Sequence, residues 1–586
     1  MALRAVLGVV RRIGCVRPLP LRRYFAAPSP DEHRYLEALK ENERLYPSDH
    51  QLLAQSHAEL AKHYLTTKQP ALGLRHSLQQ FQLLHLVTPQ PVADLLDVGR
   101  LCVELLYSEF KYADCEALAS RLVEIAKQAH PANGLEVARA HFMLSHLKEV
   151  QGKLEEAVGQ CLQAVDIVKQ HKEPEFLSSL FQTLGSLKKN LEQFPEAETY
   201  ISTSLALLEN SQSAAKDDLT ASAYCVKGEI YAAQGQFPQS EDCFKRALVL
   251  RRGAQEPNKA EIASCLNSLG MLYLTFGRLP EAELLFKEKL EMDKALYSEQ
   301  HPATANSYHN LAAVDEAKGD FPGAKAHFLK ALSIRQQTLP PNHPHIPLVH
   351  QNLVGISLAL QELDEAERHA KQAAELGRQA YPEDHPFMAT AHFDMGVVQD
   401  ARGQLQEALT SHLKALELRL KSYAEEHQLV GSSYLGIGQT YKKLNQTAKA
   451  NEYYHKGYSI MKKVMDDDHP DLATILNNMG SINYAQGNFA EAEEDLRKSL
   501  KLRLRALPEH SPAVVTTRAN LAAALLGAKK LAEAEGELKT CLSVVEQRKG
   551  EAGLTPELVA RMLLSALKGQ QKEKEAAALA KHYGLS

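Results

Sequence analysis

The feature that most constrains this chain is a segment of 42 residues that repeats along much of its length. The hexapeptide GRLPEA at 277–282 has relatives upstream and downstream, and each relative ends in a small residue. From Ser240 to Ala534 these small residues follow one another at intervals of 42 residues. A fixed period of this length indicates a repeat architecture rather than a string of unrelated globular domains. We call these small residues the anchors: Ala157, Ala197, Ser240, Ala282, Ala324, Ala366, Ala408, Ala450, Ala492 and Ala534.

Each repeat is predicted to contain two helices. Leu-Pro-Glu-Ala or a relative begins the second helix, because proline is tolerated in a first helical turn and glutamate favours the positive end of the helix dipole. A His-Pro step, as at His301-Pro302, separates that helix from the next repeat, since proline ends a preceding helix. One helix pair cannot bury its own apolar stripe, so successive pairs must stack. The histidine recurs at His343, His385, His427 and His469, and only His427 lacks the proline.

These positions resemble those of tetratricopeptide repeats. Gly270 and Ala312 match the small residue in the family's first helix, and Phe286 matches the aromatic residue in its second. The 42-residue length and the His-Pro linkers resemble the longer repeats of kinesin light chain-related proteins. The resemblance spans about residues 50–548. It implies an all-α fold, a right-handed superhelical solenoid of about twelve helix-turn-helix repeats, with the first helices along a concave groove.

The chain is predicted to have five parts. The most regular part carries the strict 42-residue period, and weaker apolar stretches precede it. The parts are a transit peptide at 1–25, a lead-in at 26–49, divergent repeats at 50–215, the regular array at 216–548 and capping helices at 549–586.

The first 25 residues differ from the rest of the chain. They contain six arginines and no acidic residue, and basic and apolar residues alternate. This pattern is typical of a mitochondrial transit peptide, and the alternative is a disordered basic tail. The segment RRYFAA resembles a matrix-processing site, in which Arg23 precedes a cut between Phe25 and Ala26. We therefore expect the protein in mitochondria, most readily in the matrix.

Charge argues against nucleic-acid binding. Removal of the six leader arginines changes the formal net charge from −5 to −11. Proteins that bind phosphate backbones obtain much of their affinity from basic surfaces, so no nucleic-acid partner is expected. No uncharged apolar run reaches the length of a membrane-spanning helix, so no such segment is predicted either.

The resemblance implies a peptide-binding groove on the first helices. In related repeats, an asparagine two residues before the small position binds the backbone of an extended peptide, and an amide offers both a donor and an acceptor. The corresponding position here also holds Asp394. The alternative is that these amides tie adjacent repeats together. Chaperone-binding relatives carry a clamp of lysine and arginine that is absent here. The predicted groove residues are Asn267, Asn306, His309, Asn310, Gln351, Asn352, Asn477, Asn478 and Asn520.

No catalytic motif is evident, and no metal or cofactor is predicted. His343, His345 and His350 lie close together in sequence, but such a histidine recurs at helix starts without a cluster, which disfavours a metal site. The run 466–468 of three aspartates is interpreted as helix capping rather than as a calcium loop. The eight cysteines form no CxxC pair and are interpreted as reduced core residues.

These observations favour a non-enzymatic adaptor inside mitochondria that binds one or more proteins through its groove. Assembly or maintenance of a respiratory complex or of the mitochondrial ribosome is a plausible setting. One alternative is a cytosolic cargo adaptor like kinesin light chain, which needs a longer heptad segment than residues 26–50 offer. The others are an organellar RNA-binding repeat protein and an enzyme with a repeat appendage, for which no stretch is left over.

Overall fold

The computed structural model describes residues 30–67, 70–88, 90–108, 112–129, 134–209, 211–213, 215–464, 470–548 and 555–585. These residues form helices and no strand, which confirms the all-α prediction. None of their helices has the length and apolar character needed to cross a membrane. The proposed cleavage residues Arg23, Phe25 and Ala26 lie outside the described residues, as do the aspartates at 466–468.

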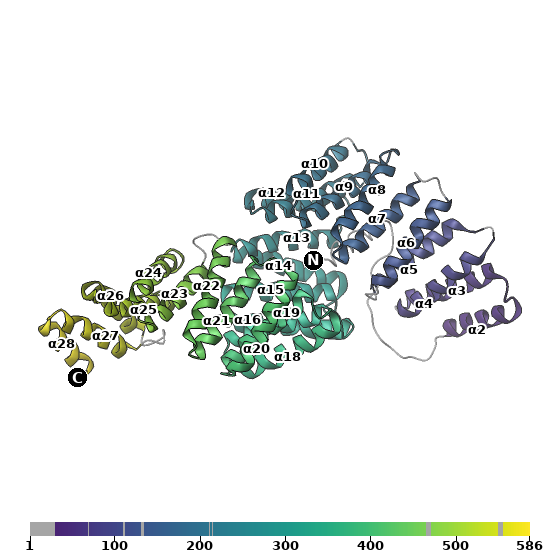
Figure 1. Cartoon of the computed structure of the whole chain (residues 1–586). Helices are drawn as coiled ribbons and strands as arrows, with labels where there is room; N and C mark the ends of the chain where they lie inside the picture. The colour runs from purple at the N-terminus through teal and green to yellow at the C-terminus, as the bar shows by residue number, and fades with distance from the viewer. Residues whose placement is uncertain are drawn as a thin grey trace. The chain divides into compact units, whose positions relative to one another are not determined.

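The chain divides into two compact units, Met1–Pro340 and Pro341–Ser586 (Figure 1). The helices of the first unit are α2 (Pro30–Leu45), α3 (His50–Thr66), α4 (Pro70–Leu86), α5 (Val92–Ser108), α6 (Tyr112–Ala129), α7 (Leu135–Val150), α8 (Leu154–Val168), α9 (Pro174–Asn190), α10 (Phe194–Glu209), α11 (Lys216–Ala233), α12 (Phe237–Gly253), α13 (Lys259–Thr275), α14 (Leu279–Tyr297), α15 (Pro302–Lys318) and α16 (Phe321–Thr338).

The helices of the second unit continue the same pattern. They are α17 (His345–Ala359), α18 (Leu363–Ala380), α19 (Pro386–Ala401), α20 (Leu405–Ser422), α21 (Gln428–Lys443), α22 (Thr447–Val464), α23 (Pro470–Ala485), α24 (Phe489–Ala506), α25 (Pro512–Gly527), α26 (Leu531–Arg548), α27 (Pro556–Gly569) and α28 (Glu573–Tyr583).

Helices α3 to α26 form twelve successive pairs, as the repeat count predicts. Within each unit the two helices of a pair pack together, and the second helix also contacts the first helix of the next pair, as α12 contacts α13 and α24 contacts α25. First helices of successive pairs touch as well, as do α11 and α13 in one unit and α23 and α25 in the other. Each pair therefore contributes to a core shared with its neighbours, which is how a repeat array gains stability.

The anchors lie where the two helices of a pair approach most closely. All ten are buried. The partner position on the first helix is equally tight: a Cβ added at Gly270 would lie 2.7 Å from Phe286 Cε1. The aromatic ring thus occupies the space that a larger residue at 270 would need. The spacing of small and large residues in the sequence is a direct consequence of this packing.

Four of the recurring histidines, those within the described residues, accept a hydrogen bond at the start of the first helix of a repeat. Nδ1 of His301 accepts a hydrogen bond from the backbone N–H of Ala303 at 3.1 Å, which satisfies one of the free donors at the helix start. The same contact forms at His343, His385 and His427, with distances of 3.0, 3.1 and 3.1 Å. His427 keeps it without a following proline. In three linkers a tyrosine stacks on the histidine ring: Tyr297, Tyr381 and Tyr423.

An arginine recurs in every second repeat of the regular array, and it is buried at Arg251, Arg335 and Arg419 and partly exposed at Arg503. Arg251 and Arg335 lie in the first unit, and Arg419 and Arg503 in the second, with 84 residues between successive members. Arg419 is only 2% exposed. Three of the four donate through Nη1 to the backbone oxygen ten residues further on, and so connect the second helix of one repeat to the first helix of the next. The acceptors are Glu261 at 3.0 Å, Leu429 at 2.7 Å and Ala513 at 2.6 Å.

Candidate functional site

The predicted groove residues all lie on first helices of repeats. Asn267 is on α13, and the others are on α15, α17, α23 and α25. We call this set the first-helix row: Asn267, Asn306, His309, Asn310, Gln351, Asn352, Asn477, Asn478 and Asn520. Eight of its members are partly exposed. Asn267 is buried, with 5% of its surface accessible, so its side chain is poorly placed for direct contact with a partner.

Two pairs of asparagines in the row connect neighbouring repeats. In the first unit, Nδ2 of Asn310 donates to Oδ1 of Asn267 at 2.5 Å. In the second unit, Nδ2 of Asn520 donates to Oδ1 of Asn477 at 3.1 Å. Both pairs are 43 residues apart, one repeat plus one residue, so the contact follows from the register of adjacent first helices. The inter-repeat tie considered for these amides therefore exists at both junctions.

These hydrogen bonds do not use the full hydrogen-bonding capacity of the two donor asparagines, Asn310 and Asn520. Asn310 and Asn520 each donate one N–H, and their Oδ1 atoms accept no hydrogen bond from the residues that the structure describes. An amide oxygen held in this way can accept from the backbone N–H of another polypeptide. A tie between repeats and a peptide contact are thus chemically compatible, because they engage different atoms of the same side chain. Peptide contact by the row stays a prediction.

A buried carboxyl occupies the same register in the second unit. Asp394 on α19 lies 43 residues after Gln351 on α17. Burial raises the pKa of Asp394 to about 6, and the opposing influences of Gln351 and Arg419 do not cancel this effect. Oδ2 of Asp394 and Nε2 of Gln351 are buried and lack a hydrogen-bond partner within the described part of the chain. Because Gln351 still lowers the pKa of Asp394, the two buried groups lie close to each other at this junction between repeats.

Two cations extend the polar contacts of the row. In the first unit, Arg335 on α16 donates through Nη2 to Oδ1 of Asn306 at 2.9 Å. In the second unit, Lys442 on α21 donates through Nζ to Oδ1 of Asn478 at 3.3 Å, and burial lowers the pKa of this lysine. Sequence reasoning did not identify either cation. The 84-residue spacing of the arginines was the available signal for Arg335, and no pattern distinguished Lys442.

His309 has an apolar environment. Its ring lies edge-on to Phe328, with centroids 5.2 Å apart. Burial, and to a lesser extent the charge of Arg335, lowers the pKa of His309 to about 4, so the ring is neutral at pH 7. The residue therefore contributes a neutral imidazole, rather than a positive charge, to the row.

The three histidines of the segment NHPHIPLVH have separate contacts. His343 caps the helix that His345 begins. His350 instead faces His369, with their Nδ1 atoms 2.8 Å apart, and burial lowers the pKa of His350 to about 4. Within the described residues, no group of three or more His, Cys, Asp and Glu side chains is arranged to hold a metal ion.

Comparison with known families agrees with this architecture. Sequence profiles described as tetratricopeptide repeat match residues 219–295, 347–421, 401–463 and 471–547, and a second profile of the same description matches 304–345. Together these matches cover more than half of the chain. The protein therefore belongs to the tetratricopeptide-repeat proteins, whose repeats typically bind other proteins.

Several solved structures are similar to parts of this chain. BtubC from P. vanneervenii is 17% identical, with 39% of this chain and 91% of that chain covered and a TM-score of 0.36. Repeats of a putative kinesin light chain from Podospora anserina are 21% identical, with 36% and 99% covered and a TM-score of 0.32. Aspartyl phosphate phosphatase F from Bacillus subtilis is 14% identical, with 64% and 96% covered and a TM-score of 0.41. At these values the likeness concerns the fold alone. No curated protein matches the chain.

Proposed function

We propose that this chain is a non-enzymatic adaptor, and that the members of the first-helix row in each unit hold an extended segment of a partner protein. The observation that carries the proposal is the geometry of Asn310 and Asn520. Each amide is oriented by a hydrogen bond to the preceding repeat, while its oxygen has no partner within the described residues. A side chain that is already fixed loses little conformational entropy when it binds a peptide N–H.

The adaptor works in mitochondria, most readily in the matrix. This part of the proposal rests on the leader, which contains six arginines and no acid within 25 residues. Assembly or maintenance of a respiratory complex or of the mitochondrial ribosome is the setting that we propose. The partners are proteins, and the acidic balance of the chain without its leader disfavours nucleic acid.

Localisation is tested by fusing residues 1–35 to a fluorescent reporter. The fusion is expected to enter mitochondria, because an arginine-rich amphipathic leader responds to the import machinery. The control is the same fusion with the six arginines of residues 1–25 changed to glutamine, which should remain in the cytosol. A diffuse cytosolic signal from the unaltered fusion would contradict the mitochondrial proposal and favour a cytosolic cargo adaptor.

Partner binding is tested by proximity labelling with the full chain and two variants. Asn310→Ala with Asn520→Ala removes both the ties and the free amide oxygens, and should lower the labelling of partner proteins several-fold. Asn267→Ala with Asn477→Ala removes the acceptors of the same two hydrogen bonds and keeps the amide oxygens of Asn310 and Asn520. This control keeps the oxygens and loses only their orientation, so it should lose clearly less labelling than the first variant. Equal effects of the two variants would mean that the amides serve only to join repeats.

A further inference from the structure

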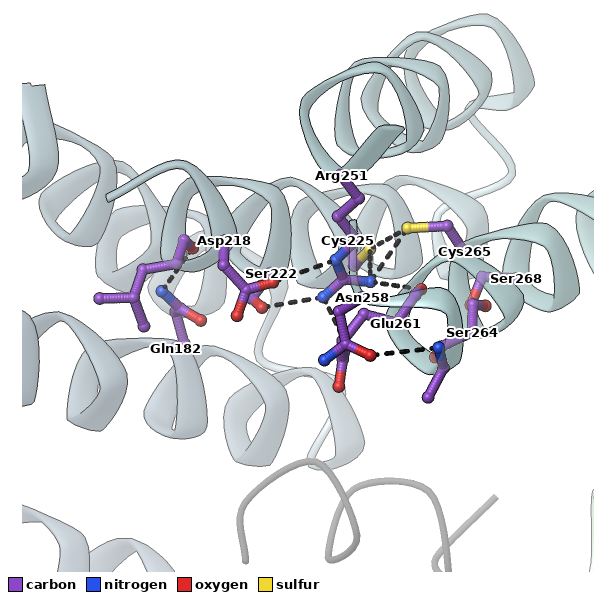
Figure 2. Close-up of polar contacts among 12 residues, drawn as sticks. Gln182, Asp218, Ser222, Cys225, Arg251, Asn258, Glu261, Ser264, Cys265 and Ser268 are labelled. Carbon is purple, nitrogen blue, oxygen red and sulfur yellow. Dashed lines mark hydrogen bonds and ion pairs between the residues drawn. The ribbon is translucent and has the colours of Figure 1, made fainter. Parts of the chain in front are cut away.

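Two cysteines of the first unit lie side by side under a buried arginine (Figure 2). Sγ of Cys225 on α11 and Sγ of Cys265 on α13 are 3.5 Å apart. Nη1 of Arg251, from the intervening helix α12, lies 3.0 Å from the sulfur of Cys265 and 3.9 Å from that of Cys225. Cys265 is buried and Cys225 is partly exposed, so the pair borders the protein surface.

Arg251 is held in this position by several other contacts. Its Nη2 pairs with the Glu261 carboxylate at 2.8 Å and donates to Oγ of Ser222 at 3.0 Å. Its Nε lies 3.5 Å from the Asp218 carboxylate. Figure 2 shows these groups converging on the guanidinium from α11 and α13. The arginine therefore cannot withdraw from the sulfur of Cys265 without the loss of several interactions.

We propose that Cys225 and Cys265 are a site of oxidation, at which a hydroperoxide converts the two thiols into a reversible disulfide. The pair consists of two sulfurs in contact, with a cation beside one of them, and the other belongs to a partly exposed residue. These are the features that distinguish reactive cysteines from buried structural ones. The other described cysteines are each buried without a neighbouring thiol within hydrogen-bond distance.

The electrostatics assign different roles to the two sulfurs. The hydrogen bond from Cys225 and the charge of Arg251 lower the pKa of Cys265, although burial opposes them. The same hydrogen bond, together with burial, raises the pKa of Cys225. By contrast, burial alone raises the pKa of Cys102 to about 12. Cys265 is thus the thiol that loses its proton more readily and attacks, and Cys225 is the thiol that resolves the product.

The reaction consumes one hydroperoxide and two thiols. The Cys265 thiolate attacks one oxygen of hydrogen peroxide, the O–O bond breaks, and the departing hydroxide takes up a proton as water. Cys265 is then a sulfenic acid. Cys225 loses its proton as its sulfur attacks that of Cys265, the S–O bond breaks, and a second water leaves. Two electrons pass from the sulfurs to the peroxide, and one disulfide remains.

The disulfide would join two successive repeats. An S–S bond is about 2.05 Å long, so the sulfurs must approach by about 1.5 Å from their present separation of 3.5 Å. The bond would fasten α11 to α13, which otherwise are held together by side-chain packing and by Arg251. It would also remove the negative charge from Cys265, and Arg251 would then depend on Glu261, Asp218 and Ser222 for its partners.

The test treats the folded full-length protein with hydrogen peroxide and maps its cysteines by mass spectrometry without reduction. The expected result is a Cys225–Cys265 linkage that a thiol reductant removes. It should form at least about tenfold faster than oxidation of Cys102, whose pKa is far higher. Two unlinked cysteines, or a linkage to any other cysteine, would overturn the proposal.

A variant identifies the attacking sulfur. Cys225→Ser removes the resolving thiol, so peroxide should leave a sulfenic acid on Cys265 that a dimedone-type reagent labels. Cys265→Ser should show no label on Cys225, and circular dichroism should show that both variants keep their helical content. Label on Cys225 of the second variant, or none on Cys265 of the first, would contradict the assigned roles. The mapping of the unaltered protein needs no variant and decides the proposal independently of their folding.

Discussion

At the scale of single residues, the array depends on a few close approaches that recur. The pair Gly270 and Phe286 shows how tight they are, since the nearest ring atom would lie 2.7 Å from an added Cβ. No real Cβ contact is that short, so the ring must shift if the glycine is replaced. The restriction comes from the ring, whereas a Cβ added at some other helical glycines, such as Gly159, would meet no atom within 4 Å.

Gly270→Ala is therefore expected to lower the free energy of unfolding by about 1–3 kcal/mol, as overpacking of a core does. The control is Gly159→Ala on α8, where an added Cβ meets no atom within 4 Å. That change should raise stability by about 0.5–1 kcal/mol, because alanine loses less conformational entropy than glycine in a helix. Urea unfolding followed by circular dichroism measures both. A neutral Gly270→Ala would show that the ring relaxes freely.

Some residue contacts could be predicted from the sequence and others could not. The 12-residue offset between Gly270 and its anchor predicts which residues are small. The pairing of Asn267 with Asn310 depends on the axial offset between neighbouring first helices, and the 42-residue period alone does not give that offset. Cys225 and Cys265, 40 residues apart, meet for the same reason and belong to no sequence motif.

At the scale of the helix, the linkers decide where each first helix begins. His385 is representative: its Nδ1 accepts from the backbone N–H of Phe387 at 3.1 Å, and the ring of Tyr381 stacks on it with centroids 4.2 Å apart. Burial lowers the pKa of His385, which keeps Nδ1 free of a proton and able to accept. The neutral ring is thus both a cap and a packing surface.

His385→Ala should cost about 0.5–2 kcal/mol, the usual range for the loss of a side-chain cap. His385→Asn keeps an acceptor at the cap and loses only the stacked ring, so it should recover part of that loss. Thermal unfolding of the two variants at pH 7.5 provides the comparison. If asparagine were no better than alanine, the ring stacking and not the hydrogen bond would account for the contribution of His385.

The existence and type of the helices followed from the sequence, but the role of the histidine did not. The His-Pro step was interpreted through proline, which both ends and begins helices. The repeat with His427 and Gln428 could have revealed this role, because the histidine is present there without a following proline and still caps its helix. A side chain that can accept a hydrogen bond, placed two residues before a free backbone N–H at a helix start, would have predicted the cap.

At the scale of the whole molecule, many histidines are kept neutral by burial. Desolvation disfavours the charged imidazolium, so each of these residues has a folded pKa below the ordinary value of 6.5. Desolvation raises the pKa values of four carboxyls, which act in the opposite direction: Glu104, Glu316, Asp394 and Asp495. The histidines are more numerous: His57, His76, His141, His301, His309, His350, His385 and His392.

The protein is therefore expected to lose stability in mild acid. Between pH 6.5 and about 4 these histidines bind more protons in the unfolded chain than in the folded protein, so the free energy of unfolding falls as the pH falls. Their contribution is complete above pH 6.5 and decreases as the pH falls through that window, down to about 4 for His76, His309 and His350. Urea unfolding at pH 7.5, 6.5, 5.5 and 4.5 measures the effect.

His309→Gln identifies one contributor. Glutamine does not titrate, so the slope of stability against pH below 6.5 should decrease by up to about 1.4 kcal/mol per pH unit, the value for one proton. The variant is compared with the unaltered protein by slope rather than by absolute stability, because loss of the ring contact with Phe328 lowers stability at every pH. An unchanged slope would mean that His309 does not resist protonation in the folded chain.

Because the recurring arginines occur in every second repeat, they restrict how such a chain can gain or lose repeats. Arg251, Arg335, Arg419 and Arg503 recur every 84 residues, so two neighbouring repeats are not interchangeable, although their backbones are alike. Excision or duplication of one 42-residue unit would place two arginine-bearing repeats, or two without arginine, in succession. Gain or loss of two units leaves the alternation intact. The unit by which this array can be lengthened or shortened is thus a pair of neighbouring repeats. A shortened variant should therefore lack an even number of repeats.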